Sequence, residues 1–419
     1  MADSLFDILT ARGLVQDATP GAAERLAAGP VTAYVGFDPT ADSLHVGSLV
    51  PVMGLAWVQR TGGRPIALVG GGTGMVGDPS GKRAERPVLS MEQIDSNARA
   101  LEQQLRRFLR FDGANAARLL DNSAWLRDLK LMDFLRDTGK HFTVSYMLQK
   151  ESVKNRMEAG ISYTEFSYML VQAYDFWQLL RTEGCELQMG GSDQWGNITA
   201  GIELISRREG RQAHAVVFPL LTTTAGSKFG KSEDGNIWLD PARTRPYHFY
   251  QFWLNTDDRD VERLLSFFTF LPLEEIGRVM AEHGPDPSRR IAQRCLAREV
   301  TALVHGDAEA DKAVAGSAVI FGTRGDDTDY SALAATMPNV SATVAEVEAG
   351  LALTDVLVRA GLASSKGEAR RGIEGKGFSV NDVPESDVLR RITRADLRQE
   401  RYVMLRKGKK NYAMLVVEG

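Results

Sequence analysis

The sequence predicts an α/β protein in which a parallel sheet covered by helices is followed by a helical region and a small terminal unit. Three observations carry this prediction. Short apolar runs alternate with helical patterns through the first half, helical patterns alone follow, and a polar, glycine-bearing stretch precedes a compact basic end. A length of 419 residues is typical of about two to four domains. We expect domains at 1–225, 226–322 and 349–419, with a linker at 323–348.

The expected strands and helices follow from hydrophobic spacing. In the segment 91–110, apolar residues recur at steps of three and four from Ile94 to Phe108, which marks one face of a helix. Sheets with parallel strands bind ligands beyond the carboxyl ends of those strands, so we expect the chemistry there. The expected strands are 32–37, 65–69, 118–121, 186–189 and 215–218, and the expected helices include 45–60 and 91–110.

The composition excludes several classes of protein. A hydrophobic share of 43% and a charged share of 25% exclude a disordered chain. Cys185 and Cys295 stand far apart and the six histidines form no HExxH pair, so we expect no disulfide framework and no metal cage. No apolar run approaches the roughly 18 residues that cross a bilayer, and the acidic start is unlike a signal peptide. A cytosolic protein without a membrane segment is therefore expected.

The net charge of −4 hides a split along the chain. Residues 349–419 hold 14 Lys and Arg against 9 Asp and Glu, a balance of +5, which leaves −9 for the preceding 348 residues. Nine of those basic residues lie within 390–410. A charge run is usually only a solvated surface, but an excess on a compact terminal unit behind a linker favours contact with a phosphate backbone.

A glycine-rich stretch at 70–77 directly follows an expected strand and contains a formal GxGxxG at Gly72, Gly74 and Gly77. That spacing would suit a dinucleotide on a helix N-terminus, as in an NAD-dependent oxidoreductase. However, Asp-Pro-Ser-Gly follows at 78–81, where that motif needs a continuing helix, and the Walker A pattern fails as well. We therefore interpret this stretch as a turn at which the backbone contacts a ligand or a packed helix, and NAD binding is a minor alternative.

Two short segments gain meaning from their order along the chain. His45–Ser48 reads HVGS and follows the first expected strand, and Lys228–Ser232 reads KFGKS and follows the last. Alone, the first would be a structural histidine near a helix start and the second a solvated basic loop. Their ordered combination, about 180 residues apart, is specific and favours a functional interpretation of both.

Tyr168, Gln172 and Asp175 lie at positions i, i+4 and i+7 of one expected helix, which puts them on a narrow stripe. The rest of that helix is apolar nearly all round, so these polar groups need hydrogen-bond partners. We interpret the stripe as contacts to a polar ligand. The sequence GGSDQWGN at 190–197 adds another polar turn just past a strand end.

Taken together, these segments resemble class I aminoacyl-tRNA synthetases, and within them the bacterial tyrosyl-tRNA synthetase family. His45–Ser48 is similar to the HIGH motif, Lys228–Ser232 to the KMSKS motif, and the resemblance spans the whole chain. It implies a Rossmann-like catalytic domain, an all-helical domain and a small α+β RNA-binding domain similar to one in a small-subunit ribosomal protein. One departure is Ser48, where the family has a second histidine that contacts the nucleotide; a hydroxyl can still form a hydrogen bond.

The resemblance implies that tyrosine and ATP form tyrosyl-adenylate and pyrophosphate, and that tyrosine then passes to the 3′ end of tRNA(Tyr). It also implies a cytoplasmic homodimer. Mg²⁺ would accompany ATP without a dedicated protein cage, and no tightly bound cofactor is expected. The tryptophanyl-tRNA synthetases share the fold and motifs but lack the terminal unit and have no need of a phenol clamp. A nonenzymatic RNA-binding protein would explain only the basic end.

The resemblance also implies roles for single residues. Because the attacking substrate carboxylate is already ionised, the reaction needs alignment and cations rather than a general base. The implied catalytic residues are Thr40, His45, Lys82, Arg86, Lys228 and Lys231. Tyrosine would be bound by Tyr34 and Asp175 at its phenol and by Asp78, Tyr168 and Gln172 at its ammonium group, and Gln194 would bind it as well. The implied ATP contacts are Gly36, Asp38, Gly47, Ser48, Gly191, Asp193, Lys231 and Ser232, and the implied tRNA contacts are Arg370, Arg371, Arg406, Lys407, Lys409 and Lys410.

Overall fold

The computed structural model of the chain divides into two compact units. Unit 1 comprises Met1–Thr244 and Asn255–Leu296, and unit 2 comprises Arg245–Leu254 and Ala297–Gly419. No helix in the described part of the chain is long and apolar enough to cross a membrane. The structure describes residues 3–80, 89–157, 160–224, 226, 229–232, 235–321, 330–331, 334, 337–408 and 411–418.

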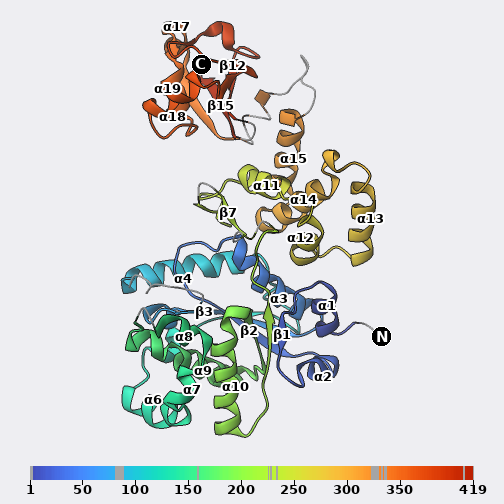
Figure 1. Cartoon of the computed structure of the whole chain (residues 1–419), viewed down its shortest axis with the longest axis vertical. Coiled ribbons are helices and arrows are strands. Elements are labelled where there is room, and N and C mark those ends of the chain that lie inside the picture. The colour runs from blue at the N-terminus through green and yellow to red at the C-terminus, as the bar shows by residue number, and fades with distance from the viewer. Residues whose placement is uncertain are drawn as a thin grey trace. The chain divides into compact units, whose positions relative to one another are not determined.

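Unit 1 is built on a six-stranded sheet in the order β1-β6-β5-β2-β3-β4, of which Figure 1 labels β1, β2 and β3. The five strands β2 to β6 run parallel, and β1 joins the edge antiparallel to β6. This order confirms the predicted Rossmann-like α/β fold. The strands are β1 Asp17–Ala18, β2 Thr32–Phe37, β3 Arg64–Val69, β4 Arg118–Asp121, β5 Leu187–Gly191 and β6 His214–Phe218.

Helices cover both faces of this sheet, and its central strands are therefore mostly apolar, with Gln188 in β5 as an exception. All five residues of β6 are buried, as expected for a strand with packing on either side. The helix α3 packs so closely that a Cβ on Gly54 would lie 2.3 Å from the ring of Phe218. The helices of unit 1 are α1 Leu5–Ala11, α2 Ala22–Ala27, α3 Leu49–Arg60, α4 Met91–Leu105, α5 Ser123–Leu126, α6 Leu131–Asp137, α7 Val144–Leu148, α8 Glu151–Met157, α9 Tyr163–Glu183, α10 Trp195–Glu209, α12 Val261–Phe268 and α13 Leu273–His283.

The longest helix, α9, has clear signals at both ends. The Ser162 side chain accepts a hydrogen bond from the backbone N–H of Glu165, and Gly184 ends the helix in a left-handed conformation with φ of 66°. Two other helices differ from expectation. The helix expected at 45–60 starts as a 3₁₀ turn at Val46–Ser48, and the one expected at 91–110 ends at Leu105. Element ends are the part of a sequence prediction that local pattern fixes least.

The strand order reverses between β2 and β5. From β2 the chain adds β3 and β4 on one side, and it then returns to add β5 and β6 on the other. Crossovers therefore leave β2 and β5 toward opposite sides, and a crevice opens beyond their carboxyl ends. Phe37 ends one of these strands and Gly191 ends the other, so the residues that follow each of them border that crevice.

Unit 2 contains a helical part and a separate terminal sheet. In the helical part, α11 (Pro246–Leu254) packs against α15 (Asp307–Phe321). The helix α14 spans Ile291–His305, and its residues from Ala297 onward belong to unit 2. The terminal sheet has the order β12-β11-β14-β15-β9, with β9 parallel to β15 and the other pairs antiparallel. β10 and β13 pair in a separate two-stranded sheet. The elements of this terminal part are β9 Asn339–Thr343, α17 Val344–Ala349, β10 Leu351–Ala352, α18 Leu353–Arg359, α19 Lys366–Glu374, β11 Phe378–Val380, β12 Val383–Glu385, β13 Arg391–Ile392, β14 Tyr402–Lys407 and β15 Asn411–Glu418.

Candidate active site

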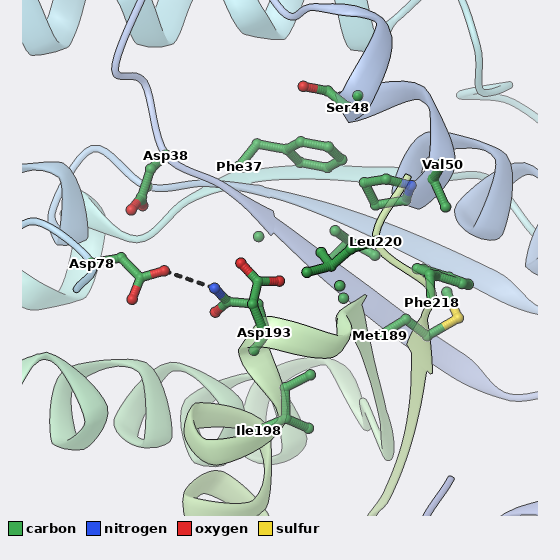
Figure 2. Close-up of a pocket in the computed structure, with 18 of the residues that line it drawn as sticks. Phe37, Asp38, Ser48, Val50, Asp78, Met189, Asp193, Ile198, Phe218 and Leu220 are labelled. Carbon is green, nitrogen blue, oxygen red and sulfur yellow. Dashed lines mark hydrogen bonds between the residues drawn. The ribbon is translucent and has the colours of Figure 1, made fainter. Parts of the chain in front are cut away.

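A cavity of about 640 Å³ lies at the reversal of strand order, where β2 and β5 end (Figure 2). Residues from distant parts of the sequence meet there: the strand ends, the HVGS segment, the glycine-rich turn and α9. The predicted site residues that line it are Tyr34, Gly36, Asp38, Thr40, His45, Gly47, Ser48, Asp78, Tyr168, Gln172, Asp175, Gly191, Asp193 and Gln194.

Tyr34 and Asp175 line the cavity and are 1% and 2% exposed. The Tyr34 hydroxyl has no hydrogen-bond partner within the described chain, although it is fully buried. Burial raises the pKa of Asp175 to about 7, and burial together with the charge of Asp175 raises the pKa of Tyr34. A buried hydroxyl without a partner beside a carboxyl group is suited to bind a polar ligand group that both donates and accepts a hydrogen bond.

Two donors hold the Asp175 carboxyl group in place. The side-chain amide of Asn122 donates to one oxygen at 2.8 Å, and the indole N–H of Trp125 donates to the other at 2.7 Å. Asn122 follows β4 directly, and Trp125 lies one turn later on α5. The carboxyl group therefore keeps a fixed orientation, since each oxygen already has a partner from the protein.

Asp38 lines the same cavity and accepts two side-chain hydrogen bonds. The Tyr168 hydroxyl donates to Asp38 Oδ2 at 2.9 Å, and the Thr73 hydroxyl donates to Asp38 Oδ1 at 2.8 Å. Burial, followed by the charges of Asp38 and Asp78, raises the pKa of Tyr168 well above its ordinary value. Tyr168 therefore remains a neutral donor at physiological pH.

Asp78 completes an acidic border on the same cavity. Gln194 Nε2 donates to Asp78 Oδ2 at 2.7 Å, and Asn197 Nδ2 lies 3.4 Å from Oδ1. Figure 2 shows Asp38, Asp78 and Asp193 bordering the cavity, with Phe218 and Leu220 also lining it. Among the described residues of the lining, none is Lys or Arg. This surface would favour a positively charged ligand group.

The HVGS segment lies at the cavity edge before α3. A Cβ on Gly47 would lie 2.8 Å from the imidazole carbon Cε1 of His45, so glycine leaves room for the imidazole where it lies. Ser48 also lines the cavity and ends the short 3₁₀ turn that leads into α3. Backbone N–H groups at such a helix start are suited to bind an anion.

The glycine-rich turn does not form a dinucleotide-binding motif. Between β3 and Ser80 the described chain forms a 3₁₀ turn at Thr73–Met75 and no α-helix, and residues 81–88 lie outside the described part. The glycines allow close contact with side chains instead: a Cβ on Gly70 would lie 2.2 Å from Asp38 Oδ1, and one on Gly71 would lie 2.4 Å from an Asp121 oxygen. The NAD alternative thus loses the helix on which it depended.

Several predicted residues cannot be placed. Lys82, Arg86, Lys228, Lys409 and Lys410 lie outside the described residues. Lys231 and Ser232 form β7, which pairs with β8 (Gly235–Asn236), and the positions of their side chains are not described.

The remaining basic residues predicted to contact tRNA lie on a helix and a strand of the C-terminal part of unit 2. Arg370 and Arg371 are exposed on α19. Arg406 and Lys407 lie on β14, where Lys407 Nζ contacts Glu368 Oε1 at 2.7 Å and Arg406 donates to the Ser379 hydroxyl at 3.1 Å. This ion pair lowers the pKa of Glu368 to about 2.

Sequence reasoning missed Asn122, Trp125 and Gln188. The first two followed an expected strand, and the rule that sites lie beyond strand ends would have drawn attention to them. Gln188 is a polar residue inside the apolar strand β5, it is 3% exposed, and its side-chain oxygen has no partner within the described chain. A buried amide in a central strand is itself a signal, because burial without a partner is costly.

Comparison with known proteins identifies the family. The family model of class I tRNA synthetases (W and Y) matches residues 26–322, and that of the tyrosine--tRNA ligase SYY-like C-terminal domain matches residues 309–415. A tyrosine--tRNA ligase of Anaeromyxobacter dehalogenans is 59% identical over 418 residues, 99% of each chain. This chain belongs to the tyrosine--tRNA ligase family of class I tRNA synthetases.

Further relatives of this family agree. A tyrosine--tRNA ligase of Roseiflexus castenholzii is 50% identical and covers 98% of this chain and 99% of its own. A solved structure of a C-terminally truncated mitochondrial tyrosyl-tRNA synthetase from Aspergillus nidulans has a TM-score of 0.70 at 35% identity, over 76% of this chain and 94% of that one. The predicted family is confirmed, and neither the tryptophan nor the NAD alternative is favoured.

Proposed function

We propose that the chain activates L-tyrosine with ATP, releases pyrophosphate, and transfers the tyrosyl group to the 3′ end of tRNA(Tyr). The observation that carries the substrate assignment is the buried Tyr34 hydroxyl beside Asp175. A phenol can accept a hydrogen bond from Tyr34 and donate one to Asp175, whereas an indole or a phenyl ring cannot do both. Family membership gives the reaction, and this pair gives the choice of amino acid.

The ammonium group of tyrosine would bind at the acidic border. Asp78 offers a carboxylate already oriented by Gln194, and Tyr168 is held by Asp38. Gln172 lines the same cavity from α9. An ammonium group has three donors and needs three acceptors, and this border supplies oxygen atoms from separate side chains.

In the first step, a carboxylate oxygen of tyrosine attacks the α-phosphorus of ATP and the bond to pyrophosphate breaks. In the second step, a ribose hydroxyl of tRNA attacks the tyrosyl carbonyl carbon and AMP leaves. Thr40 and His45 would stabilise the charge that develops on the departing phosphates, while Asp38, Gly36, Gly47, Ser48, Gly191 and Asp193 border the nucleotide. Mg²⁺ would bind phosphate oxygens of ATP rather than a protein cage.

The described lining carries no Lys or Arg, so cations for the pyrophosphate must come from elsewhere. Lys82 and Arg86 follow the glycine-rich turn in sequence, and Lys228, Lys231 and Ser232 follow β6. We assign to them the role of neutralising the leaving group.

The remaining steps concern tRNA. In the domain scheme given above, residues 1–225 would form the adenylate, 226–322 would face the anticodon side, and 349–419, after the linker 323–348, would bind tRNA. The excess of +5 on the terminal region and the exposed Arg370 and Arg371 support contact with a phosphate backbone. Arg406, Lys407, Lys409 and Lys410 would join them.

The segment between β4 and the start of α9 supports a homodimer. It carries a concentration of exposed large apolar side chains, with Tyr163 75% exposed and Met132 73% exposed. Such surface is uncommon on a monomer and is suited to pair with a second copy of the same chain. Exposed members of the group are Leu131, Met132, Leu135, Val144, Leu148, Met157 and Tyr163.

The experiment that tests this function is ATP–pyrophosphate exchange screened across the amino acids. Exchange with tyrosine alone supports the assignment, and exchange with tryptophan alone would contradict it. Charging of tRNA(Tyr) with labelled tyrosine tests the second step. The buried thiol of Cys185 is compatible with a reducing cytoplasm, where we expect the reaction to take place.

A further inference from the structure

The chain that returns from the KFGKS segment pairs directly with the HVGS segment. After the hairpin of β7 and β8, the backbone N–H of Val46 donates to the carbonyl of Ile237 at 2.9 Å, and that of Leu239 donates to the carbonyl of Leu44 at 2.8 Å. His45 and Trp238 face each other as an antiparallel bridge between these two bonds. The two motifs therefore share one short piece of β-structure.

The turn before that hairpin lies against HVGS as well. Gly230 adopts a φ of +89°, and a Cβ built on it would lie 3.5 Å from the backbone nitrogen of Gly47. Its carbonyl accepts a hydrogen bond from Ile237 at 3.0 Å. Both ends of the hairpin thus contact the segment that carries His45.

The Trp238 side chain continues this contact. Its ring meets the His45 imidazole edge-on, with centroids 6.2 Å apart and planes at 63°. The Arg243 guanidinium lies 3.7 Å from the indole centroid, and Arg243 also pairs with Asp42 at 2.5 Å. Asp42 lies three residues before His45, so the indole is held between the histidine and an ion pair anchored on the same segment.

Trp238 itself does not line the described cavity, whereas His45 does. We propose that Trp238 is a positioning residue that fixes the His45 imidazole toward the reacting phosphates, with Arg243 and Asp42 holding the indole in place. This inference rests on the proposed role of His45 in adenylate formation. It makes the rate of that step depend on a side chain that contacts neither tyrosine nor ATP.

The expected effect is a loss of rate rather than of tyrosine binding. An imidazole that samples other rotamers stabilises the transition state less often, while the pocket of Tyr34 and Asp175 remains intact. We expect Trp238→Ala to slow single-turnover adenylate formation about tenfold and to leave the KM for tyrosine within twofold. Trp238→Phe keeps an aromatic edge and should recover most of that rate.

The decisive measurement is a double-mutant cycle with His45→Ala. If Trp238 acts through His45, Trp238→Ala slows the wild-type chain about tenfold but changes the His45→Ala chain by less than twofold. Trp57→Phe is the matched control: Trp57 also has a guanidinium over its ring, from Arg12 at 4.4 Å, and an edge contact with Phe270, and it does not line the cavity. Trp57→Phe should leave the rate of adenylate formation unchanged both in the wild-type chain and in the His45→Ala chain.

The outcomes separate this inference from the proposed function. If the rate losses of Trp238→Ala and His45→Ala multiply in the double variant, Trp238 does not act through His45. This result would overturn the positioning role while leaving His45 catalytic. A His45→Ala chain as fast as wild type would overturn the proposed role of His45, and with it the inference. If Trp238→Ala does not fold, Arg243→Met replaces it in the cycle; it removes the cation and the Asp42 pair but keeps the indole, and it should show the same dependence on His45.

Discussion

Replacing Asp175 by alanine should remove the preference for tyrosine over phenylalanine while sparing ATP. The carboxyl group is 2% exposed and is oriented by Asn122 and Trp125 at 2.8 and 2.7 Å. The substrate phenol would donate to this carboxylate and accept from Tyr34. In Asp175→Ala, bound tyrosine loses its hydrogen bond to the carboxylate. Phenylalanine binds better relative to tyrosine, because it no longer has to leave that buried carboxyl group without a phenol partner.

The size of the effect follows from the charge of the acceptor. A hydrogen bond to a charged group contributes about 1.5–3 kcal/mol, which corresponds to a loss of about 10- to 150-fold in the ratio of kcat/KM for the two amino acids. The free energy of unfolding should change less than the selectivity, because two effects of the substitution oppose each other. The variant leaves two donors without their partner, but it also removes a carboxyl group whose burial raises its pKa from 3.8 to about 7, a cost of roughly 4 kcal/mol once it is ionised.

Pyrophosphate exchange measures kcat/KM for tyrosine and for phenylalanine, and the same assay at varied ATP measures the KM for ATP. The control is Trp125→Phe, which removes one donor to Asp175 and keeps the carboxyl group; its loss of selectivity should be smaller. Unchanged discrimination in Asp175→Ala would refute the phenol assignment, and an equal loss of affinity for ATP would show that the change had disturbed the whole cavity.

Four further predictions follow from the structure. Because burial raises the pKa of Asp175 to about 7, the KM for tyrosine should be up to about tenfold higher at pH 6 than at pH 8, and Asp175→Asn should flatten that profile in the exchange assay. Ser48→Ala should raise the KM for ATP by about 2- to 10-fold, the value of one neutral hydrogen bond, with the KM for tyrosine unchanged. Replacing both Arg370 and Arg371 by alanine should leave exchange intact, weaken charging of tRNA and lower its salt slope by about two. Met132→Glu should shift the chain toward monomers in sedimentation, since it puts a charge on an apolar surface that is exposed in a single chain.

Much of the catalytic fold could be predicted because the strands of a covered parallel sheet are continuous apolar runs. The expected strand at 118–121 is β4, residue for residue, and the expected strand at 32–37 is β2. The edge strand β1 was missed, because its two residues, Asp17 and Ala18, carry no periodic signal and become a strand only by pairing with β6. Its existence depends on tertiary contact, which a local pattern does not contain.

The candidate site also contains residues that local spacing predicts and residues that only tertiary contact brings together. Tyr168, Gln172 and Asp175 could be grouped in advance because a helix places i, i+4 and i+7 on one side. The partners of Asp175 could not, since Asn122 and Trp125 are about fifty residues away and meet it only through the sheet. Likewise, the bridge between His45 and Trp238 joins residues almost two hundred positions apart, and neither spacing nor composition indicates it.

The two donors on Asp175 also limit how this pocket could be adapted to a new amino acid. A ligand without a phenol would call for an apolar residue at position 175, but that change alone would leave the amide of Asn122 and the indole N–H of Trp125 buried with nothing to bind. Each orphaned donor costs about 1–3 kcal/mol. Redesign, whether in the laboratory or in evolution, therefore involves Asn122 and Trp125 as well as Asp175, because these three side chains satisfy one another's hydrogen bonds.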